Sequence, residues 1–355
     1  MADRLQLKVG GKSYSGWERA SIKTSMEAAA GVFRLEVEPA VPERPGGAIN
    51  WPIKPGQPCD LVYGNRRLIH GHVDRVGMSL NGRRRRYVVS GRDATADLID
   101  CSATNSPDQW QNLDIFEIAA QLADPFGVSV GINVDPGDVF PIFKLQPSET
   151  PWAAIERMCR MRGLLAFTPG NGSLLITAPS TTRLDVELAE GKNVLAASGE
   201  SSMNDRFSEY TVTGQSFGND QLYGENAAHI SGQAKDNEVT RFRPKVVLAE
   251  GVVSTGASQR RAEWEATIRA ARATKASASV IGWRQAEGGL VWEMNRVISC
   301  KIPSIAIESD MLISSVELTI ENRSSEKATL GLVRPDAYKP QPAIELQTNP
   351  YSAFV

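Results

Sequence analysis

The segment Tyr87–Cys101 reads YVVSGRDATADLIDC and decides the fold that the sequence predicts. It begins with the strand-forming residues Tyr87–Val89, which follow the tight-turn signal Asn81-Gly82 and a run of arginines. This order predicts the second strand of a β-hairpin. The extended pattern then stops, and an aspartate precedes a short segment of helical character. We interpret four residues as the structural junction where a first β-domain ends: Ser90, Gly91, Arg92 and Asp93.

The pattern of this strand occurs a second time in the chain. Tyr210–Gln215 again has an aromatic residue, β-forming residues, a hydroxyl and a glycine. Leu68–Val73 and Leu312–Val316 also resemble each other, since both begin with Leu-Ile and end with a valine. We therefore predict an internal repeat whose second copy is interrupted by an insertion. The residues assigned to the start of this second copy are Asp205, Arg206, Tyr210 and Gly214.

The length of 355 residues is enough for several domains that each bury a core. Strand-like patterns dominate both ends, whereas helical spacing occurs at 115–122, after the capping-box pair Asp114 and Glu117, and at 259–275. We expect an α+β, multidomain fold with two related β-barrel domains, a small α/β domain and a helical insertion. The expected boundaries are 1–100 for the first β-barrel domain, 101–200 for the α/β domain, 201–335 for the second β-barrel domain with its helical insertion at about 240–290, and 336–355 for an extended, proline-containing tail.

Charge and composition exclude several function classes. The 39 Lys and Arg residues nearly cancel the 41 Asp and Glu residues, so no global field favours nucleic acid or an anionic membrane. No apolar run approaches the roughly 18–20 residues that cross a bilayer, and the N-terminus lacks the apolar core of a signal peptide. We expect assembly in the cytoplasm without direct membrane insertion. Because no two cysteines form a C-x-x-C pair, we expect neither a metal site nor a disulfide framework, and no cofactor.

Two motifs suggest catalysis or metal binding, and we reject both. Gly214–Gly218 matches the G-x-S-x-G pattern of a hydrolase nucleophile at Ser216. The only later histidine, His229, is too close in sequence for the usual order of a catalytic triad. His70 and His72 would share one face of a strand, but no third zinc ligand with suitable spacing is visible.

The most concentrated charge in the chain is a run of four arginines. Such a run could line a channel that passes nucleic acid, because phosphate contacts are electrostatic and independent of sequence. It could also belong to a solvated hairpin arm whose alternate arginines pair with carboxylates, and we prefer this interpretation. The residues considered for this lumen or interface charge are Arg83, Arg84, Arg85 and Arg86.

Several segments occur in the same order as in a known protein family and cover nearly the whole chain. They are SGRDATADLIDC at Ser90–Cys101, QWQN at Gln109–Asn112, PFGV at Pro125–Val128, SET at Ser148–Thr150, RGLL at Arg162–Leu165, DRFSEYTV at Asp205–Val212 and VTRFRP at Val239–Pro244. With these segments the chain resembles the baseplate hub of Mu-like contractile phage tails, the Mu tail protein P family. That family is related to the hub of the T4 tail and to the N-terminal domains of type VI secretion spike proteins.

The resemblance implies a non-enzymatic structural protein. Its expected form is a homotrimeric ring in which two related β-barrels per chain give pseudo-six-fold symmetry. The ring would join a hexameric tail tube protein to a trimeric, membrane-piercing central spike protein, and would contact other baseplate proteins, with possible passage of DNA through its lumen. The expected location is the virion tail baseplate, after assembly in the host bacterial cytoplasm.

Two alternatives to the phage hub remain open. The first is the hub of a phage-derived bacteriocin (tailocin) or of a secretion spike, which would have the same structural role in another particle. The second is a cell-wall-binding or cell-wall-cleaving module of the tail tip, for which Ser216 and Glu209 would be the residues to replace.

Overall fold

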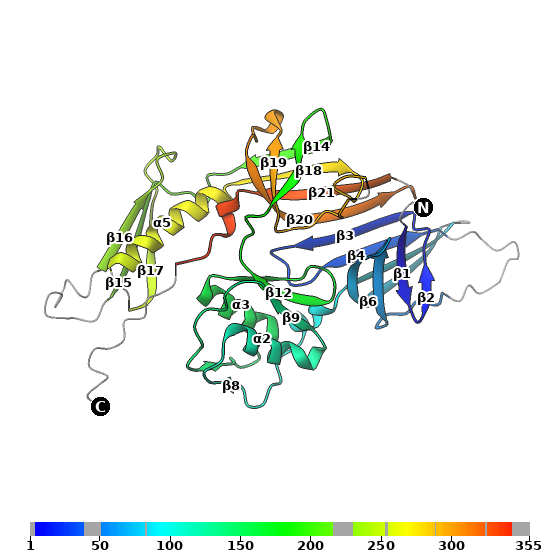
Figure 1. Cartoon of the computed structure of the whole chain (residues 1–355), viewed down its shortest axis with the longest axis horizontal. Helices are drawn as coiled ribbons and strands as arrows, with labels where there is room; N and C mark the ends of the chain where they lie inside the picture. The colour runs from blue at the N-terminus through cyan, green and yellow to red at the C-terminus, as the bar shows by residue number, and fades with distance from the viewer. Residues whose placement is uncertain are drawn as a thin grey trace, which may run out of the picture. The chain divides into compact units, whose positions relative to one another are not determined.

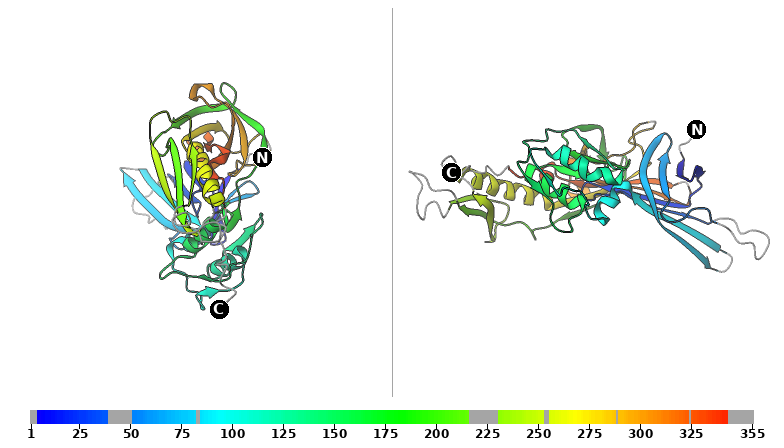
Figure 2. Two further views of the ribbon diagram at one scale, coloured as in Figure 1. Left: turned by 90° about the vertical axis from the view of Figure 1, so that its left-hand side faces the viewer. Right: turned by 90° about the horizontal axis from the view of Figure 1, so that it is seen from below.

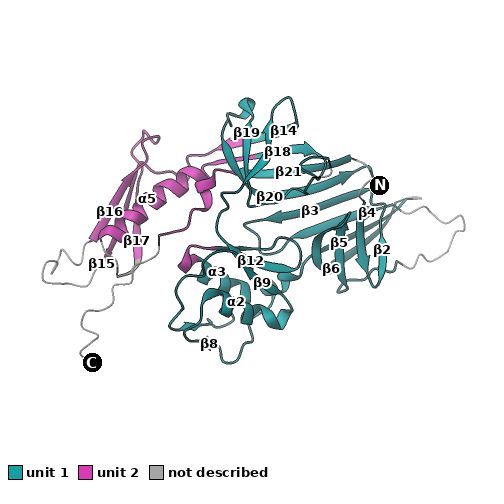
Figure 3. Cartoon of the chain, in the orientation of Figure 1, with its two compact units in different colours: residues 1–159, 165–198, 277–332 teal, residues 160–164, 199–276, 333–355 magenta. Residues whose placement is uncertain are grey.

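The computed structural model describes seven parts of the chain (Figure 1 and Figure 2). These parts are residues 4–38, 51–81, 84–215, 230–252, 255–287, 289–323 and 325–342. The chain divides into two compact units (Figure 3). The first unit consists of 1–159, 165–198 and 277–332, and the second consists of 160–164, 199–276 and 333–355. Strands are the main elements of the described structure and helices are few, in agreement with the strand-like patterns that dominate both ends of the sequence.

A 13-stranded sheet is the main element of the first unit. Its first seven strands are β1 (Leu5–Val9), β2 (Lys12–Tyr14), β3 (Arg19–Ser25), β4 (Val32–Val37), β5 (Pro58–Tyr63), β6 (Arg66–Asn81) and β7 (Arg84–Asp93). The other six are β13 (Arg183–Ala189), β14 (Val194–Ser201), β18 (Thr274–Ile281), β19 (Val297–Lys301), β20 (Asp310–Glu321) and β21 (Ser325–Val333). The order is β14-β18-β21-β20-β3-β4-β7-β6-β5-β1-β2, and β19 pairs with β20 and β13 beside this path.

The large sheet contains the same strand order twice. In the first half, β3 to β7 lie in the order β5-β6-β7-β4-β3. In the second half, β14 and β18 to β21 lie in the order β19-β20-β21-β18-β14, which is the same arrangement of five strands taken in chain order. The halves meet where β20 pairs antiparallel with β3, from Ser315↔Ser25 to Ile320↔Ala20. Leu68–Val73 in β6 and Leu312–Val316 in β20 thus lie on equivalent strands, as the predicted repeat requires.

The other half of the predicted repeat is wrong. Tyr210 lies in β15 (Glu209–Gln215), the middle strand of a separate three-stranded sheet with β16 (Ile230–Lys235) and β17 (Pro244–Val252). The strand equivalent to β7 is β21. Tyr87 and Tyr210 give similar patterns because each starts a segment in which every second residue is buried. This alternation carries no information about which strand is the neighbour.

The second unit contains the sequence that lies between β14 and β18. Helix α5 (Thr255–Arg272) packs on one face of the three-stranded sheet, with Tyr210 and Val212 buried. The contact is close at Gly232, where an added Cβ would lie 2.2 Å from the backbone nitrogen of Gln259. This helix falls where the sequence predicts a helical insertion, whereas the domain boundaries themselves stay a prediction.

The segment between β7 and β13 forms the small helical part of the first unit. It contains η1 (Ala94–Ala96), α1 (Asp97–Asp100), β8 (Gln109–Trp110), α2 (Ile115–Ala123), η2 (Asp124–Phe126), β9 (Ser129–Ile132), β10 (Phe143–Lys144), α3 (Pro151–Arg162), β11 (Leu165–Phe167) and β12 (Ser173–Thr177). The capping box predicted at the start of α2 is confirmed, because the backbone N–H of Glu117 donates to Asp114 Oδ1 at 2.8 Å and that of Asp114 donates to Glu117 Oε2 at 3.0 Å. Two further 3-10 turns are η3 (Pro303–Ile305) and η4 (Pro335–Tyr338).

The first residues of the predicted tail lie against α5. Trp264 Nε1 donates to the carbonyl oxygen of Lys339 at 2.8 Å, and Arg272 Nε donates to that of Ala337 at 2.9 Å. Residues 343–355 lie outside the described part of the chain. Among the described helices, none is long and apolar enough to span a bilayer.

Candidate assembly interface

Asp93, the last residue of β7, connects this strand to the turn between β11 and β12 through a hydrogen bond. Its side chain is 1% exposed. Oδ1 accepts hydrogen bonds from the backbone N–H of Thr95 at 3.2 Å and from its hydroxyl at 2.9 Å, while Oδ2 accepts from the backbone N–H of Gly172 at 3.0 Å. Burial raises the pKa of Asp93, and the hydrogen bonds from Thr95, Gly172 and Thr168 oppose this rise. The junction predicted from sequence therefore joins segments 79 residues apart.

The other junction residues lie on β7 around a close strand contact. An added Cβ on Gly91 would lie 2.1 Å from the carbonyl oxygen of His72, so only glycine fits there. Arg92 binds Asp74 through Nε at 2.7 Å and Asp100 through both terminal nitrogens at 2.7 and 3.2 Å. These hydrogen bonds raise the pKa of Arg92. Ser90, beside them, is half-buried.

Three of the four residues predicted to begin the second copy, Arg206, Tyr210 and Gly214, are buried in the second unit instead. Arg206 is 5% exposed and binds both oxygens of Asp236 at 2.8 Å, and it also binds Glu238 at 2.8 Å. The hydrogen bonds from these carboxylates raise the pKa of Arg206 against the effect of burial. Three further residues complete the set: Tyr210, whose hydroxyl accepts from Phe207 N at 3.0 Å; Gly214, which is buried in β15; and Asp205, which is exposed.

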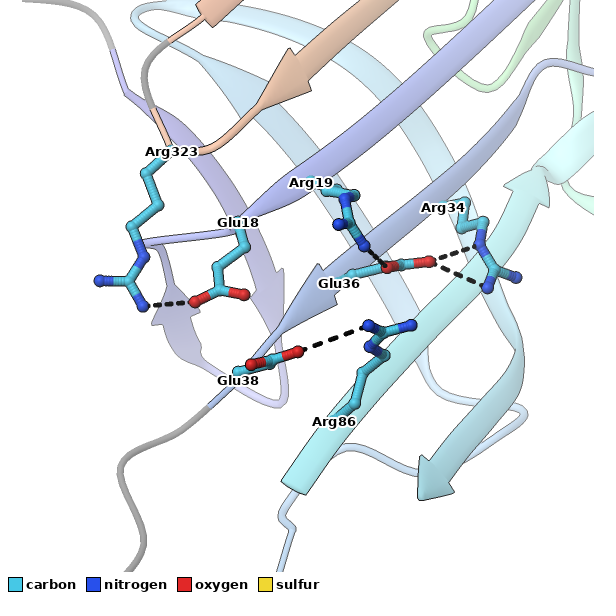
Figure 4. Close-up of polar contacts among 7 residues, drawn as sticks. All are labelled: Glu18, Arg19, Arg34, Glu36, Glu38, Arg86 and Arg323. Carbon is cyan, nitrogen blue, oxygen red and sulfur yellow. Dashed lines mark hydrogen bonds and ion pairs between the residues drawn. The ribbon is translucent and has the colours of Figure 1, made fainter. Parts of the chain in front are cut away.

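Arg86 lies on the polar face of the large sheet, within a group of ion pairs from neighbouring strands (Figure 4). It contacts Glu38 with an N–O distance of 3.4 Å. Glu36 accepts from Arg19 at 3.3 Å and Arg34 at 3.0 Å. Burial acts to raise the pKa of Glu36, but the two guanidinium groups outweigh it and lower the pKa. This pairing of Arg86 matches the interpretation of the run as a hairpin arm.

The other arginines of the run differ in their surroundings. Arg84 is exposed and Arg85 is half-buried on the same strand, and Arg83 lies outside the described residues. Next to this run, Met78 and Leu80 of β6 are 63% and 69% exposed. This exposed apolar pair was not predicted from the sequence, because residue alternation does not show that β6 runs for 16 residues, far longer than the mean strand of about 5–6.

The residues of the two rejected motifs are described only in part. Gly214 of the nucleophile motif is described, but Ser216 and His229 are outside the described residues. Glu209 pairs with exposed Lys235 at 3.3 Å. His70 Nδ1 lies 2.7 Å from Asp60 Oδ1, and within the described ranges no three His, Cys, Asp or Glu side chains form a group that could hold a metal.

Comparison with known proteins finds four family models along the chain. They are "Mu phage baseplate assembly protein GpP-like, N-terminal" at residues 4–93, "Baseplate hub protein gp44-like, second domain" at 95–178, "Tail protein NMB1110-like, third domain" at 206–264 and "Mu phage baseplate assembly protein GpP, fourth domain" at 254–341. Each describes part of a phage tail or baseplate protein.

Similar whole proteins include a phage baseplate protein, a prophage tail protein and a component of a secretion system. The chain is 32% identical to the baseplate hub protein gp44 of Escherichia phage Mu over 94% of its own length and 88% of that protein. The 43 kDa tail protein of prophage MuSo2 from Shewanella oneidensis is 33% identical, with a TM-score of 0.85 over 95% of this chain and 99% of that one. A component of the type VI secretion system of E. coli shares the fold, with a TM-score of 0.59 and 11% identity over 95% and 80% of the two chains. The chain therefore belongs to the family of baseplate hub proteins of Mu-like phage tails.

Proposed function

We propose that this protein is the structural hub of a contractile tail, a homotrimeric ring that adapts a hexameric tail tube protein to a trimeric central spike protein. The observation that supports this proposal is the strand order that occurs twice in the large sheet. Two similar modules in each of three chains would offer six near-equivalent positions to a hexameric tube, while the three chains offer three to a spike. In this proposal the two five-strand modules take the place of the two related β-barrels expected from the sequence.

A hub must withstand sheath contraction, so the contacts between its subunits must be large and permanent. A permanent interface between subunits buries about 2,000 Å² or more. The joint between the two modules within one chain is already strong, because β20 and β3 continue a single sheet through six paired residues. The ring would act as a mechanical and geometric adaptor without chemistry of its own. Other baseplate proteins would bind its outer surface, and any DNA would pass through its lumen.

The same role fits a tailocin or secretion particle. The type VI secretion component that shares the fold supports this second candidate. Both candidates place the protein at the end of a contractile tube, with assembly in the bacterial cytoplasm before the particle acts. Presence or absence of capsid genes beside the gene for this chain distinguishes them.

The mass of the purified protein tests the proposed ring. Size-exclusion chromatography with light scattering at micromolar concentration is expected to give three times the mass of one chain. The expectation follows from the large interface that a load-bearing ring needs. A stable monomer at that concentration would contradict the proposed function.

A further inference from the structure

In the β6–β7 hairpin, the sheet face that is buried at Tyr87 and Val89 continues outward to residues that are exposed. Val76 pairs with Val89, Met78 with Tyr87 and Leu80 with Arg85, so these residues share one face of the hairpin. Tyr87 is 5% exposed, and Trp51 stacks on its ring at 4.4 Å. The pale-blue to cyan strands of the hairpin extend away from the rest of the first unit (Figure 2).

The face that continues past Tyr87 is apolar, cationic and open. Met78 and Leu80 are 63% and 69% exposed, and Arg85 lies directly opposite Leu80. The other face of the same hairpin is polar, with Ser79 opposite Arg86. We call Met78, Leu80 and Arg85 the arm surface. A surface that combines two large apolar side chains with a guanidinium group fits a partner that is both apolar and acidic.

One segment of this chain has that composition. Residues 108–142 hold six Asp and Glu and no Lys or Arg. Within them, the loop 135–142 exposes Val139 by 47% and Ile142 by 63%, together with Asp135 and Asp138. We call this loop the acceptor loop.

The start of α2 adds further negative charge beside the acceptor loop. Phe140 forms a bridge with Leu113, and its backbone N–H donates to the carbonyl oxygen of Leu113 at 2.8 Å. Leu113 immediately precedes the capping-box residue Asp114, and Glu117 follows on the first turn. The acceptor loop is therefore paired with the residue that directly precedes the two carboxylates of this capping box.

We propose that the arm surface of one copy docks on the acceptor loop of a second copy. Both surfaces are exposed in the single chain, so the contact forms between molecules. The two surfaces differ, which makes the contact head-to-tail, and such a contact closes into a ring when the rotation between copies permits it. The apolar pairs supply buried area and the opposite charges set the register. This inference rests on the proposed homotrimer and identifies one of its contacts.

A disulfide between the two surfaces tests this contact. The variant Leu80→Cys with Ile142→Cys is made in a Cys101→Ser background, because Cys101 is the exposed cysteine of this chain and the other three are buried. Mild oxidation is expected to give covalent dimers and trimers on a non-reducing gel. The matched control pairs Leu80→Cys with Leu195→Cys, a second leucine that is 50% exposed, and is expected to stay uncrosslinked.

A second experiment reverses the charges on the two surfaces. Arg85→Glu is expected to raise the concentration at which the oligomer dissociates by about tenfold. Adding Asp135→Lys and Asp138→Lys is expected to restore it. Absence of both the crosslink and the restoration in a protein whose wild-type mass is trimeric overturns this contact and leaves the proposed function intact. A monomeric wild type overturns both.

Discussion

Replacing Arg206 with methionine is expected to accelerate amide hydrogen exchange in β15 and β16 by roughly 10²- to 10⁴-fold. Breaking a buried ion pair by removing one partner costs about 3–5 kcal/mol, because the remaining charge stays buried without compensation. Asp236, which binds Arg206 through both oxygens, is 9% exposed and would be that charge. Exchange measured by mass spectrometry on peptides from the two strands checks the result.

Two further variants distinguish the loss of the buried ion pair from the loss of any basic residue in this sheet. Lys235→Met removes a basic residue from the same sheet, but the ion pair with Glu209 is exposed, so exchange is expected to change little. Arg206→Met combined with Asp236→Leu removes both buried charges and is expected to recover much of the protection. Equal exchange in Arg206→Met and Lys235→Met would show that the buried pair does not stabilise the second unit.

Replacing Gly91 with alanine is expected to lower the free energy of unfolding by about 3 kcal/mol. The added methyl group would lie 2.1 Å from the carbonyl oxygen of His72 and 2.8 Å from ring atoms of Phe33, so β6 and β7 would have to separate. Urea unfolding followed by tryptophan fluorescence measures the change.

Gly77 provides the matched control for this strand pair. It lies on β6 opposite Val88, and a Cβ added there would have its nearest neighbour at 3.7 Å, an ordinary contact. Gly77→Ala is expected to leave the unfolding midpoint nearly unchanged. If Gly91→Ala unfolds at the same urea concentration as Gly77→Ala, the junction is more adaptable than its geometry indicates.

Local sequence was sufficient for elements whose signals are local. The capping box at Asp114 and Glu117 was predictable because both hydrogen bonds lie within one helical turn. The equivalence of β6 and β20 was predictable because Leu68–Val73 and Leu312–Val316 both retain Leu-Ile at the buried start of the matching segment.

Local sequence patterns did not reveal which residues and strands far apart in the chain pair with each other. Tyr210 was placed in the wrong sheet because one-sided burial gives the same alternation in any strand. The carboxylate of Asp93 binds a backbone group 79 positions later, and Arg86 pairs with Glu38 across 48 positions, so neither partner is encoded nearby. For Met78 and Leu80 the pattern predicts an apolar face, but it does not show what covers that face.

The most direct measurement of the central claim is an averaged electron-microscope image of the purified protein viewed along its symmetry axis. The duplicated strand order predicts a closed ring with three-fold symmetry and six lobes of similar size. An image with three lobes alone, or without a ring, would contradict the account of this chain as a three-to-six adaptor.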